Sequence, residues 1–261
     1  MSRSVHHRSR RCFIAGAAVF LLGAWLPIAA PAADKAGARP WIIAADASFP
    51  PYAYLDPANG RPSGLDTEIV SAALDAVGQP HEIRLFPWER AKKMLESGQV
   101  DAAYQFVGTP ERRSQYRLAG PIRNGVTVFM ARKDGPADYR TLADLQPYLL
   151  GTVHGFAYTE EFDRAPLRKD GGAVNVEQLL RKLLAGRVDV IVGDRSQLLF
   201  LARRMGVAGE VKIIGRPLAE VPRFVGFPKG GEQQAVRFEK GLEIIRQNGT
   251  LNRITARWER Q

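Results

Sequence analysis

The sequence Leu183–Asp189 (LLAGRVD) repeats a pattern that already stands at Leu95–Asp101 (LESGQVD). Each copy is typical of a helix end, a glycine able to adopt a positive φ, and a buried strand that begins Val-Asp. Two such copies in one chain favour two lobes of similar design. The same succession is common within a single α/β domain, so the repeat alone does not require two lobes.

Hydrophobic patterning continues this alternation along the chain from residue 41 onwards. Continuous or alternating apolar runs predict strands at 41–47, 82–86, 100–106, 126–132, 149–153, 188–193, 211–214 and 224–227. Helical periodicity predicts helices at 65–77, 88–95, 176–184, 196–205, 232–247 and 251–258. Strands and helices that alternate in this way predict an α/β fold with mainly parallel sheets.

The first 32 residues have the composition of a secretory signal peptide. Residues 1–11 hold four arginines and no acid, residues 12–30 are almost wholly apolar, and Ala30-Pro31-Ala32 offers small residues for cleavage. An uncleaved membrane anchor is the alternative, because the apolar run approaches the roughly 18 residues that a span needs. Residues 9–14 (SRRCFI) also resemble the twin-arginine export signal. We therefore predict a periplasmic protein, exported by the general or the twin-arginine route.

Composition narrows the class of protein further. The 261 residues are 45% apolar and 25% charged, as in folded globular proteins. Cleavage after residue 32 removes the one cysteine and leaves 33 Lys+Arg against 27 Asp+Glu, a formal charge of +6. A disulfide scaffold is thereby excluded. The mild charge suits anionic small ligands and, together with export, argues against a nucleic-acid partner.

The motifs of common catalytic sites are missing from the predicted mature chain. It contains two histidines, His81 and His154, no cysteine, no His-Glu-x-x-His and no glycine-rich phosphate loop. His81 precedes a predicted strand and is expected at the surface, and His154 is expected to be structural. We therefore predict a protein that is not an enzyme and that holds no metal or cofactor, although carboxylate pairs are not excluded by sequence.

Binding chemistry gathers instead where predicted strands end. Ligands in open α/β sheets lie beyond the carboxyl ends of strands, and those places hold Asp46, Phe49, Trp88, Arg112 and Asp194. An arginine fork binds a carboxylate, an aspartate binds an ammonium, and aromatic faces enclose an apolar stem. The set would suit a small zwitterion. Alternatives stay open at this point: Phe49 in the core, Arg112 in solvent, and Asp194 as a helix cap.

Short motifs in a fixed order give the chain a resemblance to a known family. They are FPPY at 49–52, GLDTEI at 64–69, GQVDA at 98–102, TPER at 109–112, GRVD at 186–189, GFPKG at 226–230 and IRQNGT at 245–250. In this order and after a signal peptide, they resemble the extracellular solute-binding proteins of the polar amino-acid type, family 3. Members of that family deliver solutes to ABC importers.

The resemblance implies a two-lobed clamshell of the periplasmic-binding-protein type (type II). Each lobe would be a mostly parallel sheet flanked by helices. Lobe one would comprise 41–122 and 224–261, and lobe two 127–218. Two hinge crossovers would lie near 123–126 and 219–223. A solute would bind in the cleft, and the lobes would close on it.

The resemblance also assigns roles to single residues. Arg112 matches the arginine that holds the ligand α-carboxylate, and Asp194 matches the aspartate that receives the α-ammonium. Phe49 and Trp88 match the aromatic pair around the ligand stem. Asp46 matches a position that contacts the ligand side chain in some members.

Gly155 matches a second-lobe glycine whose backbone N–H approaches the carboxylate. The chain departs from the family at Tyr104–Gly108, where a Ser/Thr-Gly run is usual and the loop looks one residue shorter. Arg90 is expected to face solvent, with the cleft as the alternative.

These features together predict a monomeric periplasmic receptor. It would capture a small polar solute, an amino acid or a related carboxylate, for the inner-membrane permease of an ABC importer. Two alternatives remain: a dehydratase resembling the periplasmic cyclohexadienyl or arogenate enzymes, and a sensor that presents its ligand to a membrane kinase.

Overall fold

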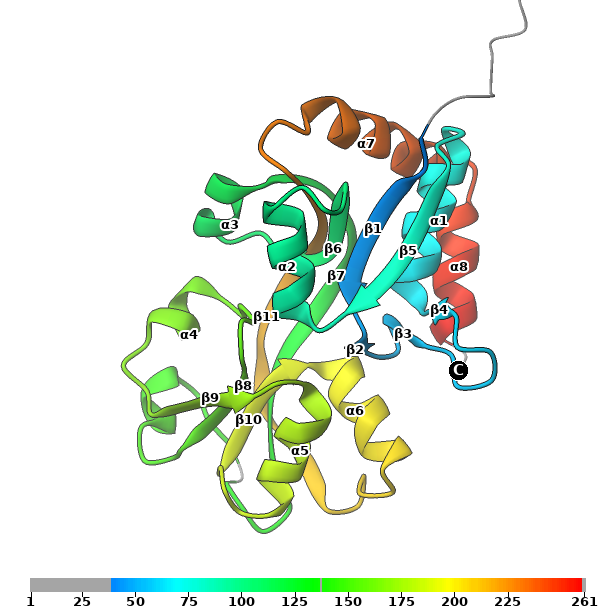
Figure 1. Cartoon of the computed structure of the whole chain (residues 1–261). Helices are drawn as coiled ribbons and strands as arrows, with labels where there is room; N and C mark the ends of the chain where they lie inside the picture. The colour runs from blue at the N-terminus through cyan, green and yellow to red at the C-terminus, as the bar shows by residue number, and fades with distance from the viewer. Residues whose placement is uncertain (1–38, 137, 260–261) are drawn as a thin grey trace, which may run out of the picture. The chain divides into compact units, whose positions relative to one another are not determined.

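The computed structural model describes residues 39–136 and 138–259 (Figure 1). The predicted signal peptide, residues 1–32, lies outside the described residues. Within the described part of the chain, no helix is both long and apolar enough to cross a membrane.

A mixed eight-stranded sheet runs through the described chain, in the order β5-β1-β6-β11-β7-β10-β8-β9. Its strands are β1 (Trp41–Asp46), β5 (His81–Phe86), β6 (Ala102–Val107), β7 (Arg117–Arg132), β8 (Leu150–Val153), β9 (Lys169–Ala173), β10 (Val190–Asp194) and β11 (Val211–Phe227). A small sheet holds β2 (Ser48–Phe49), β3 (Ala53–Leu55) and β4 (Pro62–Ser63). Each strand predicted from an apolar run overlaps one of these elements, although the predictions 41–47, 100–106, 149–153 and 188–193 extend one or two residues beyond the observed strand.

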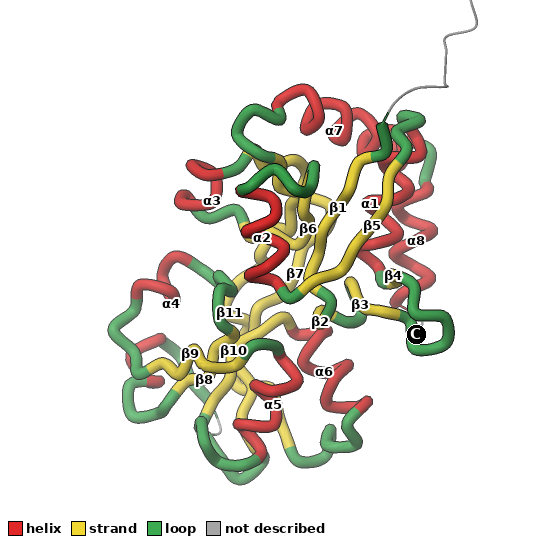
Figure 2. Tube along the Cα trace, viewed as in Figure 1, coloured by secondary structure: helices red, strands yellow, loops and turns green. Residues whose placement is uncertain are grey.

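Helices cover the eight-stranded sheet (Figure 2). They are α1 (Leu65–Ala76), α2 (Trp88–Glu96), α3 (Pro110–Gln115), α4 (Glu160–Arg164), α5 (Val176–Leu184), α6 (Arg195–Arg204), α7 (Glu232–Gln247) and α8 (Thr250–Glu259), with a 3-10 turn, η1, at Leu142–Leu145. The predicted helices match α1, α2 and α5–α8 within two residues at either end. The short elements α3, α4 and β9 were not predicted, because they hold few apolar residues.

Two long strands join the halves of the sheet. β7 and β11 are 16 and 17 residues long and pair antiparallel from Val211↔Arg132 to Phe227↔Arg117. The predictions of short separate strands at 211–214 and 224–227 were therefore incomplete. The strand pairs within β5-β1-β6 and within β10-β8-β9 are parallel, as expected, whereas β7 and β11 are antiparallel to their neighbours.

Each half of the sheet has its own hydrophobic core. We call β1–β6 and the helices α1, α2, α3, α7 and α8 the first half, and β8–β10 with α4, α5 and α6 the second half. In the first half, Ile69 and Phe238 pack on one face of the sheet, and Leu95 and Phe106 pack on the other. In the second half, α5 and α6 cover one face and Phe162 belongs to the cluster on the other. The sheet is thus buried on both faces, as parallel strands require.

We expect the packing of α1 against α7 to depend on Gly241. A Cβ atom there would lie 1.9 Å from the carbonyl oxygen of Ala73, a backbone atom that cannot move aside. Gly241→Ala should therefore lower the free energy of unfolding by about 1–3 kcal/mol, despite the higher helix propensity of alanine. Urea unfolding measures the change. Gly230→Ala is the matched control, because a Cβ there meets nothing within 4 Å; equal stability of the two variants would contradict the prediction.

Candidate functional site

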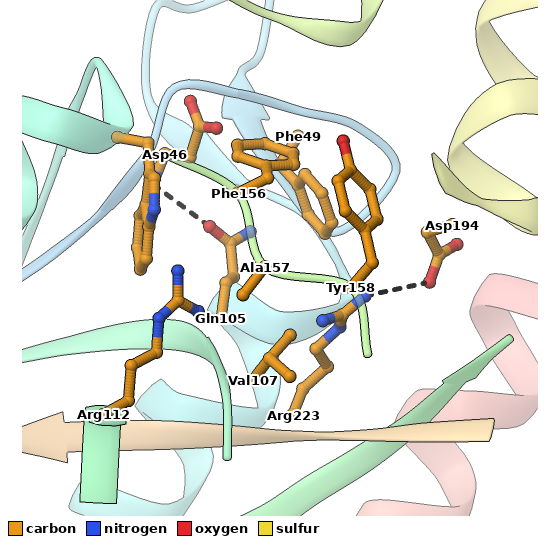
Figure 3. A pocket seen from close by; sticks show the side chains of 11 residues that line it. Asp46, Phe49, Gln105, Val107, Arg112, Phe156, Ala157, Tyr158, Asp194 and Arg223 are labelled. Carbon is orange, nitrogen blue, oxygen red and sulfur yellow. Dashed lines mark hydrogen bonds and ion pairs between the residues drawn. The ribbon is translucent and has the colours of Figure 1, made fainter. Parts of the chain in front are cut away.

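A small cavity of about 30 Å³ lies where the two halves meet (Figure 3). Its walls are made by Asp46, Phe49, Trp88, Gln105, Val107, Arg112, Phe156, Ala157, Tyr158, Asp194 and Arg223. Five of the six residues predicted to bind ligand are among them. The sixth, Gly155, lines an adjoining groove of about 640 Å³ that shares Arg112, Phe156, Ala157 and Tyr158 with the cavity. The structure thus brings the predicted residues to one place.

Local sequence explains how the first half presents Arg112. Thr109 caps α3, its hydroxyl accepting a hydrogen bond from the backbone N–H of Arg112 at 3.2 Å. Pro110 occupies the first turn, where its missing N–H costs nothing. The helix that follows β6 therefore starts at a fixed residue, which places Arg112 at the cavity.

Arg112 is a buried guanidinium without an acidic partner. Its Nη2 donates to the carbonyl oxygen of Gly155 at 3.0 Å, and its Cζ lies 5.6 Å from the ring of Trp88. No carboxylate of the described residues lies within ion-pair distance of it. Burial, followed by the charge of Arg223, lowers the pKa of Arg112 to about 10. It therefore stays charged at neutral pH, and its charge is available to an anion.

Gly155 accepts hydrogen bonds from two first-half side chains. Besides the hydrogen bond from Arg112, its carbonyl oxygen accepts a hydrogen bond from the indole Nε1–H of Trp88 at 3.2 Å. Its φ is +72°, and a Cβ there would lie 1.5 Å from Oε1 of Glu89. The positive φ favours glycine here, and any larger residue would also have to displace the side chain of Glu89.

A four-residue charge cluster lies beside the cavity. Arg123 on β7 and Arg223 on β11 are cross-strand partners, and like charges in that position repel. Asp66 at the start of α1 binds Arg123 at 2.6 and 3.2 Å. Asp194 lies 3.5 Å from Arg123 and 4.0 Å from Arg223. One acid from each half thus balances the two arginines.

This balance keeps Arg123 charged. Burial is the largest single effect and would lower the pKa of this guanidinium, but the charges of Asp66, Tyr52 and Asp194 and the hydrogen bond to Asp66 together outweigh it, so the pKa of Arg123 is raised above its ordinary value. Gly125 makes room for the cluster, because a Cβ there would lie 2.7 Å from the carboxylate of Asp194.

Asp194 combines two of the roles considered for it. As the cap of α6 it accepts from the backbone N–H groups of Ser196 and Gln197, at 3.0 and 3.2 Å. It also accepts from the hydroxyl of Tyr52 in the first half, at 2.8 Å. Asp194 lines the cavity as well, so its capping role and a place at the site are compatible. An incoming ammonium would share this carboxylate with several donors.

Asp46 is a second cavity acid, with fewer partners. Its Oδ1 accepts from the backbone N–H of Ser48 at 2.9 Å, and no basic side chain of the described chain pairs with it. Burial raises its pKa to about 6. Asp46 is thus able to accept an ammonium or hold a proton near neutral pH.

Aromatic rings from both halves meet at the cavity. Phe49 lies 5.9 Å from Phe156 in the second half and 5.4 Å from Tyr52. Trp88 packs edge-on against Phe106 at 5.0 Å. Phe49 and Trp88 are therefore packed in the protein interior and also line the cavity. For Phe49, a place in the core and a place at the cavity are thus compatible.

Gln105 is a cavity residue that sequence reasoning missed. The register between β6 and β11 shifts between Phe224 and Val225, which leaves Gln105 as an extra residue in β6. Among the described residues, Gln105 is the only non-glycine residue with a positive φ, which is 81°. Backbone strain of this kind costs roughly 1–3 kcal/mol and gathers at functional sites. The unusual run at 104–108 was the available signal.

Arg223 and the segment Phe156–Tyr158 were also missed. Phe156–Tyr158 follows β8, so the rule of strand ends that found the other residues would have found this segment too. Arg223 lies inside a long strand, where no local pattern marks it. Neither histidine lines the cavity, although the side chain of His81, expected at the surface, is only 12% exposed. Arg90 is exposed over Phe86, as predicted. The described residues contain no group of three acidic, histidine or cysteine side chains that could hold a metal ion.

Comparisons with known proteins agree on one family. The model of the bacterial extracellular solute-binding proteins, family 3, matches residues 41–261. A probable amino-acid-binding protein, YxeM of Bacillus subtilis, is 24% identical over 218 residues, which cover 80% of this chain and 79% of that protein. A probable amino-acid ABC transporter-binding protein of Haemophilus influenzae is 22% identical over 220 residues, 83% of each chain.

Among solved structures, a histidine kinase sensor domain with similarity to periplasmic binding proteins superposes with a TM-score of 0.77. It is 25% identical, and the match covers 85% of this chain and 96% of that one. The predicted clamshell class of α/β fold is thereby confirmed. The lobe boundaries at 122–127 and 218–224 remain predictions.

We expect the raised pKa of Asp46 to make stability depend on pH. The folded chain keeps this proton up to about pH 6, whereas the unfolded chain releases it near 3.8. The folded state binds more protons in that window, so the free energy of unfolding falls as pH rises through it. Relative to Asp46→Asn, the wild type should lose roughly 2–3 kcal/mol between pH 4 and 7.

Urea unfolding of the ligand-free wild type and Asp46→Asn at pH 4, 5, 6 and 7 measures this difference. Other titrating groups cancel because they are common to both proteins. Parallel pH profiles would show that Asp46 has an ordinary pKa.

Proposed function

The chain belongs to the bacterial extracellular solute-binding proteins, family 3, and we propose that it captures a small polar solute for an ABC importer. The solute is an amino acid or a related carboxylate. The names of the Bacillus and Haemophilus relatives support both the amino acid and the importer.

The observation that carries this proposal is the state of Arg112. A buried guanidinium is costly unless an anion pairs with it. Arg112 faces a cavity, with aromatic rings around it and a single backbone carbonyl as its hydrogen-bond acceptor. A ligand carboxylate in a bidentate contact would supply the missing charge. An ammonium would then be received by Asp46 or Asp194.

The size of the cavity supports a binding cycle with opening and closing. About 30 Å³ accommodates one or two water molecules and no amino acid. The halves are already linked by Tyr52–Asp194, Trp88–Gly155, Arg112–Gly155 and Gln197–Ser48 hydrogen bonds. Entry of a solute into the cavity itself would therefore require these contacts to separate. We infer that β7 and β11 act as the hinge near 123–126 and 219–223.

The proposed location and partners follow from the same role. We propose that residues 1–32 direct export and are removed, and that the mature protein works as a monomer in the periplasm. Its protein partner would be the permease of the importer. The closed arrangement of the two halves would be the form that the permease recognises.

A sensor is the second candidate function. One solved structure that superposes on this chain is the sensor domain of a histidine kinase with similarity to periplasmic binding proteins. The same pocket would then report its solute to a membrane receptor rather than deliver it. Isolation of the membrane partner separates the two: a permease supports import, and a kinase supports sensing.

Enzymatic activity is not proposed, because the family and the named relatives are binding proteins. The dehydratase alternative would need a general acid in the cavity, a place that Asp46 occupies. Incubation of the protein with prephenate, followed at the absorbance of the product, tests it; turnover that disappears in Asp46→Asn would overturn our proposal.

We expect Arg112→Ala to abolish solute binding. The solute is first identified by a thermal-shift screen of amino acids and small carboxylates, and its dissociation constant is then measured by calorimetry. Loss of a charge-assisted bidentate contact in a dry pocket costs a few kcal/mol, so affinity should fall at least about 100-fold.

Arg113→Ala is the matched control for this variant. Arg113 is the next residue of α3, is exposed, and donates to the carbonyl oxygen of Gly108 outside the cavity. It should bind the solute as the wild type does. Unchanged affinity in Arg112→Ala would contradict the carboxylate contact.

A further inference from the structure

Two buried donors of the cavity have no acceptor within the described part of the chain. They are Nε2 of Gln105 and Nε of Arg223. Buried polar groups in proteins are nearly always paired, so an unpaired one at a site needs an explanation. Both residues line the same cavity as Arg112 (Figure 3).

The orientation of the Gln105 amide is fixed by its other end. Oε1 accepts from the backbone N–H of Asp46 at 3.1 Å. Because a backbone N–H can only donate, the oxygen must lie on that side and the NH₂ group on the other. The β-bulge turns this residue toward the cavity, and its backbone keeps a positive φ to do so. Gln105 therefore presents a donor.

Arg223 is only partly neutralised. Its single acidic contact within the described chain is Asp194, at 4.0 Å, and that carboxylate is closer to Arg123. On β11, Arg223 pairs with Val107 of β6, two residues after Gln105. Its guanidinium is close enough to that of Arg112 to lower the pKa of Arg112. The cavity thus holds two cationic groups that lack a close carboxylate.

From these contacts we propose that Gln105 and Arg223 form a second anion subsite, and that the solute carries two carboxylate groups. This inference rests on the proposed function, in which Arg112 holds the first carboxylate. The second carboxylate would accept from Gln105 Nε2 and from the guanidinium of Arg223. Asp46 would face an amino group if the solute has one. Phe49 and Phe156 would contact the carbon chain between the charged groups.

The test compares diacids with their mono-amides. Calorimetry is run on the purified protein with glutamate against glutamine, aspartate against asparagine, and succinate against succinamate. Succinate and succinamate carry no amino group, so this pair shows whether binding needs an ammonium. We expect at least one diacid to bind tenfold or more tightly than its own mono-amide.

Two variants assign that preference to the subsite. Arg223→Gln keeps a long polar side chain without charge, and should weaken the diacid at least tenfold and its mono-amide less than threefold. Gln105→Glu keeps the acceptor for Asp46 N–H and replaces the free donor with an oxygen. It should also weaken the diacid at least tenfold. Thermal unfolding of each variant shows that it is folded, and the isosteric Gln105→Glu keeps the test valid if Arg223→Gln unfolds.

The outcomes separate this inference from the proposed function. Binding of monocarboxylates that depends on Arg112, with no gain from a second carboxylate, overturns the second subsite alone. Equal weakening of diacid and mono-amide in both variants does the same. A panel in which no carboxylate binds, or in which binding ignores Arg112, overturns the proposed function and this inference together.

Discussion

Two arginines side by side on neighbouring strands are the constraint on which the rest of this structure depends. Arg123 and Arg223 occupy partner positions on β7 and β11, the strands that connect the halves. Such a pair is stable in the interior only if acids from elsewhere compensate it. Asp66 comes from a helix of the first half, and Asp194 from the second. The electrostatics of the crossover therefore require both halves to be in place.

The same cluster shapes the pocket. Asp194 is drawn toward the arginines through the space that Gly125 leaves, and from there it caps α6 and accepts from Tyr52. Because Asp194 also pairs with Arg123, the charge of Arg223 is only partly compensated and remains available to a group in the cavity. Arg112, placed by α3, has no such partner. The pocket consequently presents two guanidinium groups that lack a close carboxylate, and we propose that these groups receive an anionic solute.

Sequence reasoning found the elements whose signal is local. α5 and α7 came out residue for residue, because apolar spacing and end signals define them within the segment itself. The long strand β7 was predicted only over its last seven residues, since glycine, proline and polar residues interrupt 117–125. Its continuity comes from pairing with β11, nearly a hundred residues away. Pattern alone does not contain that information.

The candidate site divides in the same way. Strand ends located Asp46, Trp88 and Asp194, because the topology of α/β sheets brings such ends together. Arg223 sits in mid-strand, and the direction of Gln105 depends on a bulge set by the partner strand, so neither was foreseeable from its own neighbours in sequence.

The arrangement of donors also explains how binding could be coupled to closure. In this structure the carbonyl oxygen of Gly155, from the second half, accepts hydrogen bonds from Arg112 and Trp88 of the first half. A solute carboxylate bound to Arg112 would lie at the position of this carbonyl oxygen. Solute binding must replace these contacts with better ones, because a neutral carbonyl does not compensate a buried guanidinium as a carboxylate does. The measured affinity is therefore the difference between two sets of contacts. The solute-free closed form gives Arg112 one hydrogen-bond acceptor, and the loss of this contact lowers the net affinity for the solute. The same form keeps the two halves close together, so that a solute carboxylate can bind Arg112 while both halves contact the solute.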